Sequence, residues 1–234
     1  MLDIRELSVK QGSFTLSADL SFKFGDRIAI VGPSGGGKST LLLTIAGFLE
    51  LSSGSIWFNS KRIDGTAPVH MPCSMLFQDN NLFPHLNVVE NVGLGIKPSL
   101  RLNPSERELV FSALKKMDLE NKALSKISEL SGGQISRVAL ARSLLRKKPV
   151  LILDEPFEAL GPAQRLEMIN YVAEFLKGYN SILLMVTHNP LDAKKIANKI
   201  VFIQEGVVSD PKDTKAFFKE PDLEIKKYLG KNYY

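Results

Sequence analysis

The sequence predicts an α/β fold: a mostly parallel core sheet, an antiparallel β-subdomain near the N-terminus and a helical portion in the middle of the chain. Two fully apolar runs, residues 150–153 and 182–186, have the composition of strands buried on both faces of a sheet. Helix-forming segments alternate with these strands, and such alternation gives parallel sheets. Apolar and polar residues alternate over residues 4–9 and 14–24, around the turn Gln11-Gly12-Ser13, which predicts an antiparallel strand pair.

The other elements follow from the same patterns. Short apolar runs predict strands at residues 27–31, 55–58, 75–77, 200–203 and 207–208. Helical patterns cover residues 38–48, 87–130, 133–148, 162–176 and 190–197. The clearest helix start is Asn103-Pro104-Ser105-Glu106, a capping residue followed by proline and then glutamate. The basic residues 146–148 suit the negative end of their helix, and Glu205-Gly206 predicts a hairpin between the last two strands.

Composition excludes several classes of protein. The 234 residues are 44% hydrophobic and 24% charged, as in a globular chain of one domain or two small ones, and the net charge of +5 leaves the kind of anionic partner open. The single cysteine, Cys73, excludes an internal disulfide. The N-terminus does not resemble a signal peptide, and the longest apolar stretch, residues 41–49, is too short to span a bilayer. Three histidines scattered along the chain argue against a zinc site.

A glycine-rich loop predicts a phosphate site. The pattern G-x-x-x-x-G-K-[ST] is matched by Gly32, Pro33, Ser34, Gly35, Gly36, Gly37, Lys38, Ser39 and Thr40. It follows a predicted buried strand and opens a predicted helix, which is the context that the motif requires. Backbone amides and the helix N-terminus would surround a triphosphate, with Lys38 near its β- and γ-phosphates. The hydroxyl of Ser39 suits Mg²⁺, which prefers oxygen ligands.

Three further polar residues are predicted at the same edge of the sheet. Asp154 and Glu155 follow a buried strand, and His188 follows the next one along the chain. Ligand sites of open α/β sheets lie at the carboxyl ends of the strands. We therefore expect Asp154 to position Mg²⁺, Glu155 to polarise an attacking water and His188 to contact the γ-phosphate.

A third motif separates this chain from kinases and GTPases. Leu130-Ser131-Gly132-Gly133-Gln134, 20 residues before Asp154, resembles the signature of ATP-binding-cassette ATPases. Gln78 is similar to that family's Q-loop glutamine and His188 to its switch histidine. All of these elements occur in the family's order, and the resemblance extends to about Asp210.

The resemblance implies a fold, a reaction and partners. It implies the P-loop ABC-ATPase fold as one cassette over residues 1–210, with a helical subdomain at about 79–148. The tail at 211–234 lies beyond the resemblance, and its six lysines and four acids predict short surface helices. It implies ATP hydrolysis with Glu155 as base, and with Gln78 and His188 sensing the γ-phosphate. Magnesium would be held by Ser39, Gln78 and Asp154, partly through water. A second copy would bind head-to-tail, each Ser131 closing the other subunit's ATP site together with Gly132, Gly133 and Gln134.

The sequence departs from the family pattern in three places. The aromatic residue that stacks on adenine is expected where Gln11 stands, and Phe14 replaces it only if the hairpin shifts register. The loop after Glu155 ends in Gly161, where the family usually has an aspartate that couples the two sites. Ile135 and Ser136 follow the signature, where polar residues, often basic ones or glutamine, are usual.

Three function classes remain open. The first is the ATPase subunit of a membrane transporter, peripheral to the cytoplasmic face of the bacterial inner membrane. The second, a soluble cassette acting on DNA or ribosomes, usually has two cassettes or a long coiled coil, and we expect no nucleic-acid partner. The third is an ATP-binding switch with weak hydrolysis.

The cargo is predicted from one segment of the chain. The stretch from Gln78 to Gly95, where such cassettes meet a permease, is similar together with residues 46–49 to the thiamine-importing bacterial members of the family. In it, the loop 80–83 is predicted to be an exposed docking surface and Leu86 a core residue. The expected cargo is thiamine or its phosphates, delivered through a periplasmic solute-binding protein. Iron(III) or another small solute is the alternative.

Overall fold

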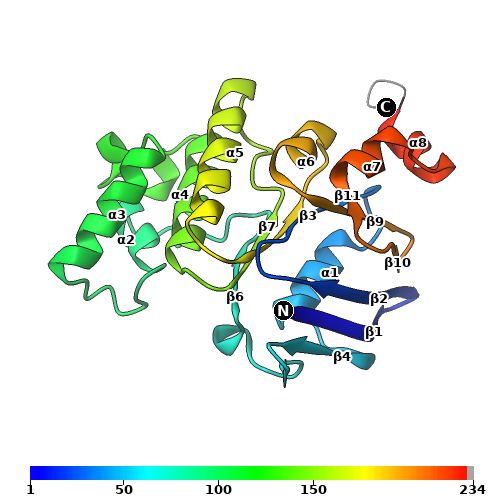
Figure 1. The fold of residues 1–234 in the computed structure, drawn as a ribbon. Coiled ribbons are helices and arrows are strands. Elements are labelled where there is room, and N and C mark those ends of the chain that lie inside the picture. Colours follow the sequence, from blue (N-terminus) through cyan, green and yellow to red (C-terminus); the bar gives the residue numbers. More distant parts are fainter. Residues whose placement is uncertain (231–234) are drawn as a thin grey trace.

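Parallel strands form the centre of the fold in the computed structural model, which describes residues 1–230 (Figure 1). In spatial order they are β6 (Cys73–Leu76), β7 (Val150–Asp154), β8 (Ile182–Val186), β3 (Arg27–Val31) and β9 (Lys199–Gln204). Each is connected to its parallel neighbours through helices or long loops, as parallel pairing requires. The predicted α/β fold class is confirmed.

An antiparallel portion extends the same sheet. Its strands are β5 (Lys61–Arg62), β4 (Ser53–Phe58), β1 (Leu2–Gln11) and β2 (Phe14–Phe22). The short strand β10 (Val207–Val208) joins the two portions, because it pairs parallel with β2 and antiparallel with β9. Along the same edge of β9, at the start of that strand, β11 (Lys212–Asp213) adds a second antiparallel pair. Within residues 1–230 the result is one sheet of eleven strands.

Helices cover both faces of the central strands. They are α1 (Lys38–Ile45), α2 (Val88–Gly93), α3 (Pro104–Lys116), α4 (Gly132–Leu145), α5 (Pro162–Lys177), α6 (Pro190–Ile196), α7 (Thr214–Lys219) and α8 (Leu223–Leu229). Short 3₁₀ turns lie at Pro68–His70, Glu120–Lys122 and Ile127–Glu129. In Figure 1, α2 and α3 lie at the end of the molecule away from β1, β2 and β4. Within residues 1–230, no helix combines the length and apolar character that crossing a membrane needs.

Two apolar clusters meet across the parallel strands. Alternate residues of β8 belong to different clusters: Leu184 packs with α1 and the antiparallel strands, whereas Leu183 and Met185 pack with α2–α6 and the C-terminal helices. All five residues of β8 are buried. This two-sided burial explains why the strand is apolar throughout instead of alternating.

Several element ends differ from the sequence predictions. The helix after the signature ends at Leu145 and not at 148, because Arg146 caps it and Lys147 has a φ of 48° that ends the helix. The first helix ends at Ile45, not 48. The tail helices are not merely a surface feature, since α7 buries Phe217 and Phe218 and α8 buries Ile225 and Leu229. Residues 231–234 of the predicted tail lie outside the described residues.

The predicted start of α3 is confirmed in detail. The side chain of Asn103 accepts a hydrogen bond from the amide of Glu106 at 2.9 Å, and the carboxylate of Glu106 accepts one from the amide of Asn103 at 2.8 Å. Pro104 occupies the first helical position. This reciprocal pair satisfies two amides that the helix itself leaves without partners.

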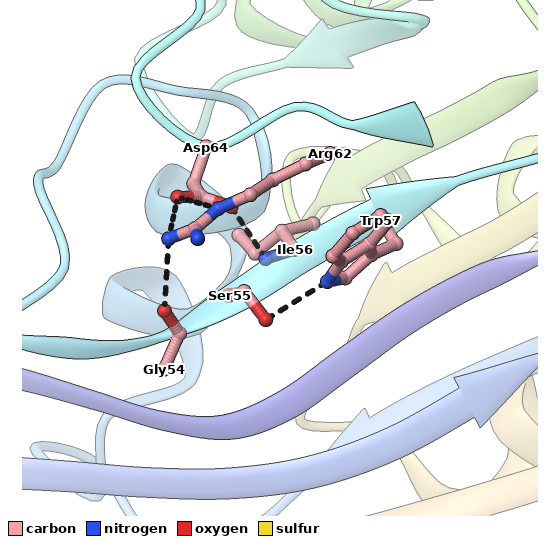
Figure 2. A network of polar contacts seen from close by, with 6 residues as sticks. All are labelled: Gly54, Ser55, Ile56, Trp57, Arg62 and Asp64. Atoms are coloured by element: carbon pink, nitrogen blue, oxygen red, sulfur yellow. Dashed lines mark hydrogen bonds and ion pairs between the residues drawn. The ribbon is translucent and has the colours of Figure 1, made fainter. Parts of the chain in front are cut away.

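A polar network fixes the outer edge of the antiparallel portion (Figure 2). The carboxylate of Asp64 accepts hydrogen bonds from the amide of Ile56 at 2.9 Å and from the guanidinium of Arg62 at 3.0 and 3.1 Å. Arg62 also donates to the carbonyl of Gly54 at 3.4 Å. These contacts hold β4 and β5 together, where only two residue pairs are in register.

We expect Asp64→Asn to destabilise the protein by roughly 0.5–1.5 kcal/mol at pH 7, the net value of one hydrogen bond. Partial burial raises the pKa of Asp64, but the hydrogen bonds from Arg62 and Ile56 outweigh it, so that the pKa lies below its usual value of 3.8. The stabilisation is therefore complete above about pH 3.8, the usual pKa of the group, and is lost as the pH falls through the lower pKa that Asp64 has in the folded state. Urea unfolding at several pH values measures this.

The exposed Asp19 of β2 offers a matched control, Asp19→Asn. The difference between wild type and Asp64→Asn should shrink in acid, while the control should match wild type at neutral pH. A difference for Asp64→Asn that stays constant down to pH 3 would contradict the role assigned to the Asp64 carboxylate.

Candidate functional site

The phosphate loop connects β3 to α1 along a path that two glycines permit. Gly32 has a φ of 148°, and a side chain there would place its Cβ 2.0 Å from the carbonyl oxygen of Ile203. Gly37 has a φ of 108°, and its Cβ would lie 2.7 Å from Leu16 and 2.9 Å from Phe14. Residues with side chains rarely adopt such backbone conformations. The glycine spacing therefore reflects close packing of the loop against β2 and β9.

Lys38 folds back into its own loop. Its ammonium donates hydrogen bonds of 2.9 Å to the carbonyls of both Gly32 and Pro33, and the residue is only 6% exposed. Burial lowers the pKa of Lys38, while the nearby carboxylates of Glu155 and Asp154 act in the opposite direction. The lysine is thus a buried cation facing two acids, at the N-terminus of α1.

The two acids lie where β7 ends. Asp154 is the last residue of the strand, and the amide of Glu155 donates to the carbonyl of Val186 at 3.1 Å, which ties it to the end of β8. Burial raises the pKa of Asp154, against the hydrogen bond with Ser39 and the charge of Lys38. Oδ1 of Asp154 is buried and has no hydrogen-bond partner among the described residues.

Glu155 and His188 contact each other. Oε1 of Glu155 pairs with Nε2 of His188, which lies two residues beyond the end of β8. Burial raises the pKa of Glu155, the neighbouring Glu158 adds to this rise and His188 opposes it. A carboxyl whose pKa is raised is a stronger base, as proton abstraction near neutral pH needs.

A cavity of about 560 Å³ joins these groups. Its walls are formed by Gln11, Phe14, Ser34, Gly35, Gly37, Lys38, Ser39, Thr40, Gln78, Glu155 and His188. Gly32, Pro33, Gly36 and Asp154 are not part of this wall. The predicted strand ends therefore do come together, and exposed Gln78, just beyond β6, faces the same space.

Phe14 lies in this cavity without the register shift that the sequence prediction required. Gln11 and Phe14 are directly opposite each other in the β1–β2 hairpin. Because the turn between them has only two residues, both side chains reach the cavity, and Gln11 also accepts a hydrogen bond from Thr40 at 3.4 Å. Counting along the sequence points to Gln11 alone and misses the pairing across the turn.

The signature residues lie outside that cavity, at the start of α4. The hydroxyl of Ser131 accepts from the amide of Gln134 at 3.3 Å, and the side chain of Gln134 accepts from the amide of Ser131 at 2.9 Å. A Cβ on Gly133 would approach the carbonyl of Ala159 to 3.3 Å. The signature and the loop after Glu155 therefore form one continuous surface, whose helix N-terminus favours an anion.

Asn91 organises the loop that follows Gln78. It is fully buried, its oxygen accepts from the amide of Phe83 at 2.8 Å, and its nitrogen donates to the carbonyls of Phe83, Leu86 and Asn87 at 3.0–3.1 Å. The sequence motifs assign no role to Asn91. Polar Asn91 between Val88 and Val92, on the apolar face of α2, is the signal that would have found it.

The loop 80–83 is exposed only in part. Phe83 is 44% exposed, whereas Leu82 packs partly against the core and Leu86, expected in the core, is half-buried. Arg142 of α4 contacts this loop at two places. Its guanidinium donates a hydrogen bond of 2.9 Å to the carbonyl of Asn80 and lies 5.9 Å from the centroid of the Phe83 ring.

Comparison with known proteins gives consistent matches. The family model described as ABC transporter matches residues 16–158. The thiamine import ATP-binding protein ThiQ of Cereibacter sphaeroides is 46% identical over 230 residues, which are 98% of this chain and 100% of that protein. The protein of the same name from Photobacterium profundum is 49% identical over 220 residues, 93% of this chain and 91% of that one.

Solved structures similar to this chain are also ATP-binding cassettes. A dimeric, post-hydrolysis structure of the ATP-binding cassette MJ0796 bound to ADP and Pi has a TM-score of 0.82 and 26% identity, and covers 92% of this chain and 99% of that one. A family model that covers more than half of the chain and relatives close to half identical over nearly its whole length lead to the same conclusion. The chain belongs to the ABC transporter family of ATP-binding cassettes.

Proposed function

We propose that this chain is the ATP-hydrolysing subunit of a bacterial importer for thiamine or its phosphates. One observation supports the chemistry above all: Lys38, Asp154 and Glu155 meet at one end of the sheet beside the glycine loop. The cargo is inferred from the relatives named as thiamine import proteins, which match 98% and 93% of this chain. A different small solute, such as iron(III), is the alternative.

The nucleotide would lie along the cavity between the loop and β2. The triphosphate would occupy the loop formed by residues 32–40, where the α1 N-terminus and Lys38 supply positive charge. Adenine would stack on Phe14, whose phenyl ring forms part of the cavity wall. Aromatic faces bind nucleobases by offset stacking.

The residues beside the loop fit Mg²⁺. Oδ1 of Asp154 is a buried oxygen with no other partner among the described residues, and the hydroxyl of Ser39 hydrogen-bonds to the same carboxylate. Hard oxygen donors of this kind, with Gln78 and water, are what Mg²⁺ prefers. When bound, Mg²⁺ would neutralise phosphate charge and fix the phosphate oxygens.

Glu155 is proposed as the base for hydrolysis. Its carboxylate accepts a proton from the attacking water, and His188 keeps the carboxylate oriented through their contact. Oε2 of Glu155, the oxygen that His188 does not contact, has no hydrogen-bond partner among the described residues. Gln78 and His188, both in the cavity wall, are placed to sense the γ-phosphate.

A second copy would complete each site. Ser131, Gly132, Gly133 and Gln134 lie outside the cavity of their own chain, as a surface acting on the other subunit's nucleotide requires. MJ0796, the structural relative, is described as dimeric.

The permease would dock between Gln78 and Gly95, where Asn91 fixes the loop, at the cytoplasmic face of the inner membrane. The periplasmic solute-binding protein would act through that permease, and no nucleic acid is involved.

Glu155→Gln should lower the turnover number for ATP at least about 100-fold and leave ATP binding in place, because the amide cannot accept the proton. Glu167→Gln, at an exposed position of α5, is the matched control. Phosphate release measures turnover, and a fluorescent nucleotide measures binding. Equal turnover in Glu155→Gln and wild type would exclude Glu155 as the base, and a very slow wild type would favour the switch function.

Gly161→Asp should raise the melting temperature by about 1–2 °C. Gly161 caps α5 with φ −65° and ψ 162°, makes no side-chain cap and has open space around its Cβ. An aspartate there accepts from the helix amides and gains a few tenths of a kcal/mol. Gly178→Asp, at the other end of α5, should lower the melting temperature, since its charge meets the negative helix end.

The same variant tests coupling between the two sites. We expect Gly161→Asp to steepen the dependence of ATP turnover on ATP concentration in the dimer. A melting temperature that falls for Gly161→Asp, or that changes equally for the two variants, would contradict the capping argument.

Asn91→Asp should impair transport more than ATP hydrolysis. The substitution keeps the shape of the side chain, but it turns a carboxylate oxygen toward three carbonyls that now accept hydrogen bonds from the amide. The loop then detaches, at a cost of about 1–3 kcal/mol for each group left without a partner. Uptake of labelled thiamine into cells deleted for this chain and complemented with each variant measures the effect.

Asn170→Ala, at an exposed position of α5, is the control for this series. Wild-type uptake with Asn91→Asp would exclude the docking role of the loop. Unchanged thiamine uptake in the deleted cells themselves would instead overturn thiamine as the cargo.

A further inference from the structure

A second cavity, of about 280 Å³, lies on the other side of Glu155 and His188. Two charged residues in its wall, Arg165 of α5 and Asp192 of α6, have no role in the chemistry proposed above. Asp192 is buried, with 4% of the residue exposed, and Arg165 is partly buried, with 24% of its side chain exposed. A buried charge on a short helix beside a reactive pair requires an explanation.

Arg165 binds the loop that follows Glu155. Its Nε and Nη2 donate to the carbonyl of Phe157 at 3.2 and 3.0 Å, and the same carbonyl accepts from the amide of Leu160 at 3.2 Å. Phe157 is only two residues from Glu155. The planar guanidinium offers several donors in a fixed geometry, which a flexible lysine does not.

Asp192 binds the segment that carries His188. Its Oδ2 accepts from the hydroxyl of Thr187 at 3.3 Å, and that hydroxyl in turn accepts from the amide of Asn189 at 3.1 Å. Thr187 and Asn189 are the two neighbours of His188 in the chain. The same Oδ2 lies 3.9 Å from Nη1 of Arg165, so the two sets of contacts are joined.

We propose that Arg165 and Asp192 are positioning residues that hold the loop after Glu155 against the segment of His188, and so set the contact between the base and the histidine. The inference rests on the proposed hydrolysis of ATP. Arg165 fixes the backbone two residues after the base, and Asp192 fixes the residues on either side of the histidine. Small displacements of reacting groups cost about 100-fold in rate, so a pair that fixes both segments controls turnover.

The geometry favours positioning over stability as the role of this pair. A charge separation of 3.9 Å is at the limit of an ion pair, and buried ion pairs contribute little to stability compared with apolar replacements. Burial also raises the pKa of Asp192, against the effects of Arg165, Thr187 and Lys195. Keeping this carboxylate ionised inside the protein therefore costs free energy of folding. Each residue is instead hydrogen-bonded to a close chain neighbour of one member of the Glu155–His188 pair: Arg165 to the carbonyl of Phe157, and Asp192 to the hydroxyl of Thr187.

Arg165→Met, Asp192→Asn and the double variant test this in the full-length chain. We expect each to lower the turnover number for ATP about ten-fold or more, with the KM for ATP within about two-fold of wild type. The double variant should be no slower than the slower single variant, because both remove the same connection. Arg165→Lys should restore activity in part, since a lysine reaches either Phe157 or Asp192 but not both.

Lys177→Met is the matched control, because Lys177 is an exposed cation of the same helix. A second measurement does not depend on turnover: the NMR signals of the His188 ring, one of three histidines, should shift in Arg165→Met and not in Lys177→Met. Unchanged turnover and unchanged His188 signals in Arg165→Met would overturn the inference while leaving the proposed function intact. A wild type without ATP turnover would refute the proposed function, and the His188 signals would then decide the positioning role alone.

Discussion

The attraction between one buried lysine and two buried acids is the interaction on which this site depends. Lys38 follows the loop after β3, and Asp154 and Glu155 lie at the end of β7, two strands away in the same sheet. Burial acts against charge on all three, lowering the pKa of the lysine and raising those of the acids. Each opposite charge offsets part of that cost. The strand order that places β3 next to β8, and β8 next to β7, therefore determines whether the charges meet.

Main-chain packing brings the phosphate loop to its place. The hairpin between β9 and β10 contacts the loop directly, because the amide of Gly206 donates to the carbonyl of Gly36 at 3.0 Å and the carbonyl of Gly206 accepts from the amide of Ser17 at 2.8 Å. A Cβ on Gly206 would lie 1.9 Å from the carbonyl oxygen of Thr15. One glycine far along the chain thus connects the phosphate loop to β2, the strand that carries Phe14.

Most of the fold and much of the site can be predicted from local patterns. The glycine loop, the acids after an apolar strand and the cap at Asn103 are signals within a few residues of sequence, and the helix start at Asn103 is confirmed atom by atom. The position of Phe14 and the roles of Asn91 and Gly206 escape such reading, because each depends on a partner brought close by folding. The burial of the tail helices escapes it for the same reason: the lysines of the tail are visible in the sequence, whereas the core that receives Phe217 and Ile225 is not.

The parts of the site differ in what holds them. The residues that would bind phosphate follow strands in the middle of the sheet, whose backbone pairs on both sides. The loop held by Asn91 has no such ladder, and side-chain bonds to a few carbonyls fix it instead. The loop held by Arg165 is anchored in addition by the buried side chains of Phe157 and Leu160. Local openings of a protein start where few contacts must break. A permease at the first loop would thus find a segment that moves at small cost, next to a rigid nucleotide site. That arrangement is what converting hydrolysis into movement requires.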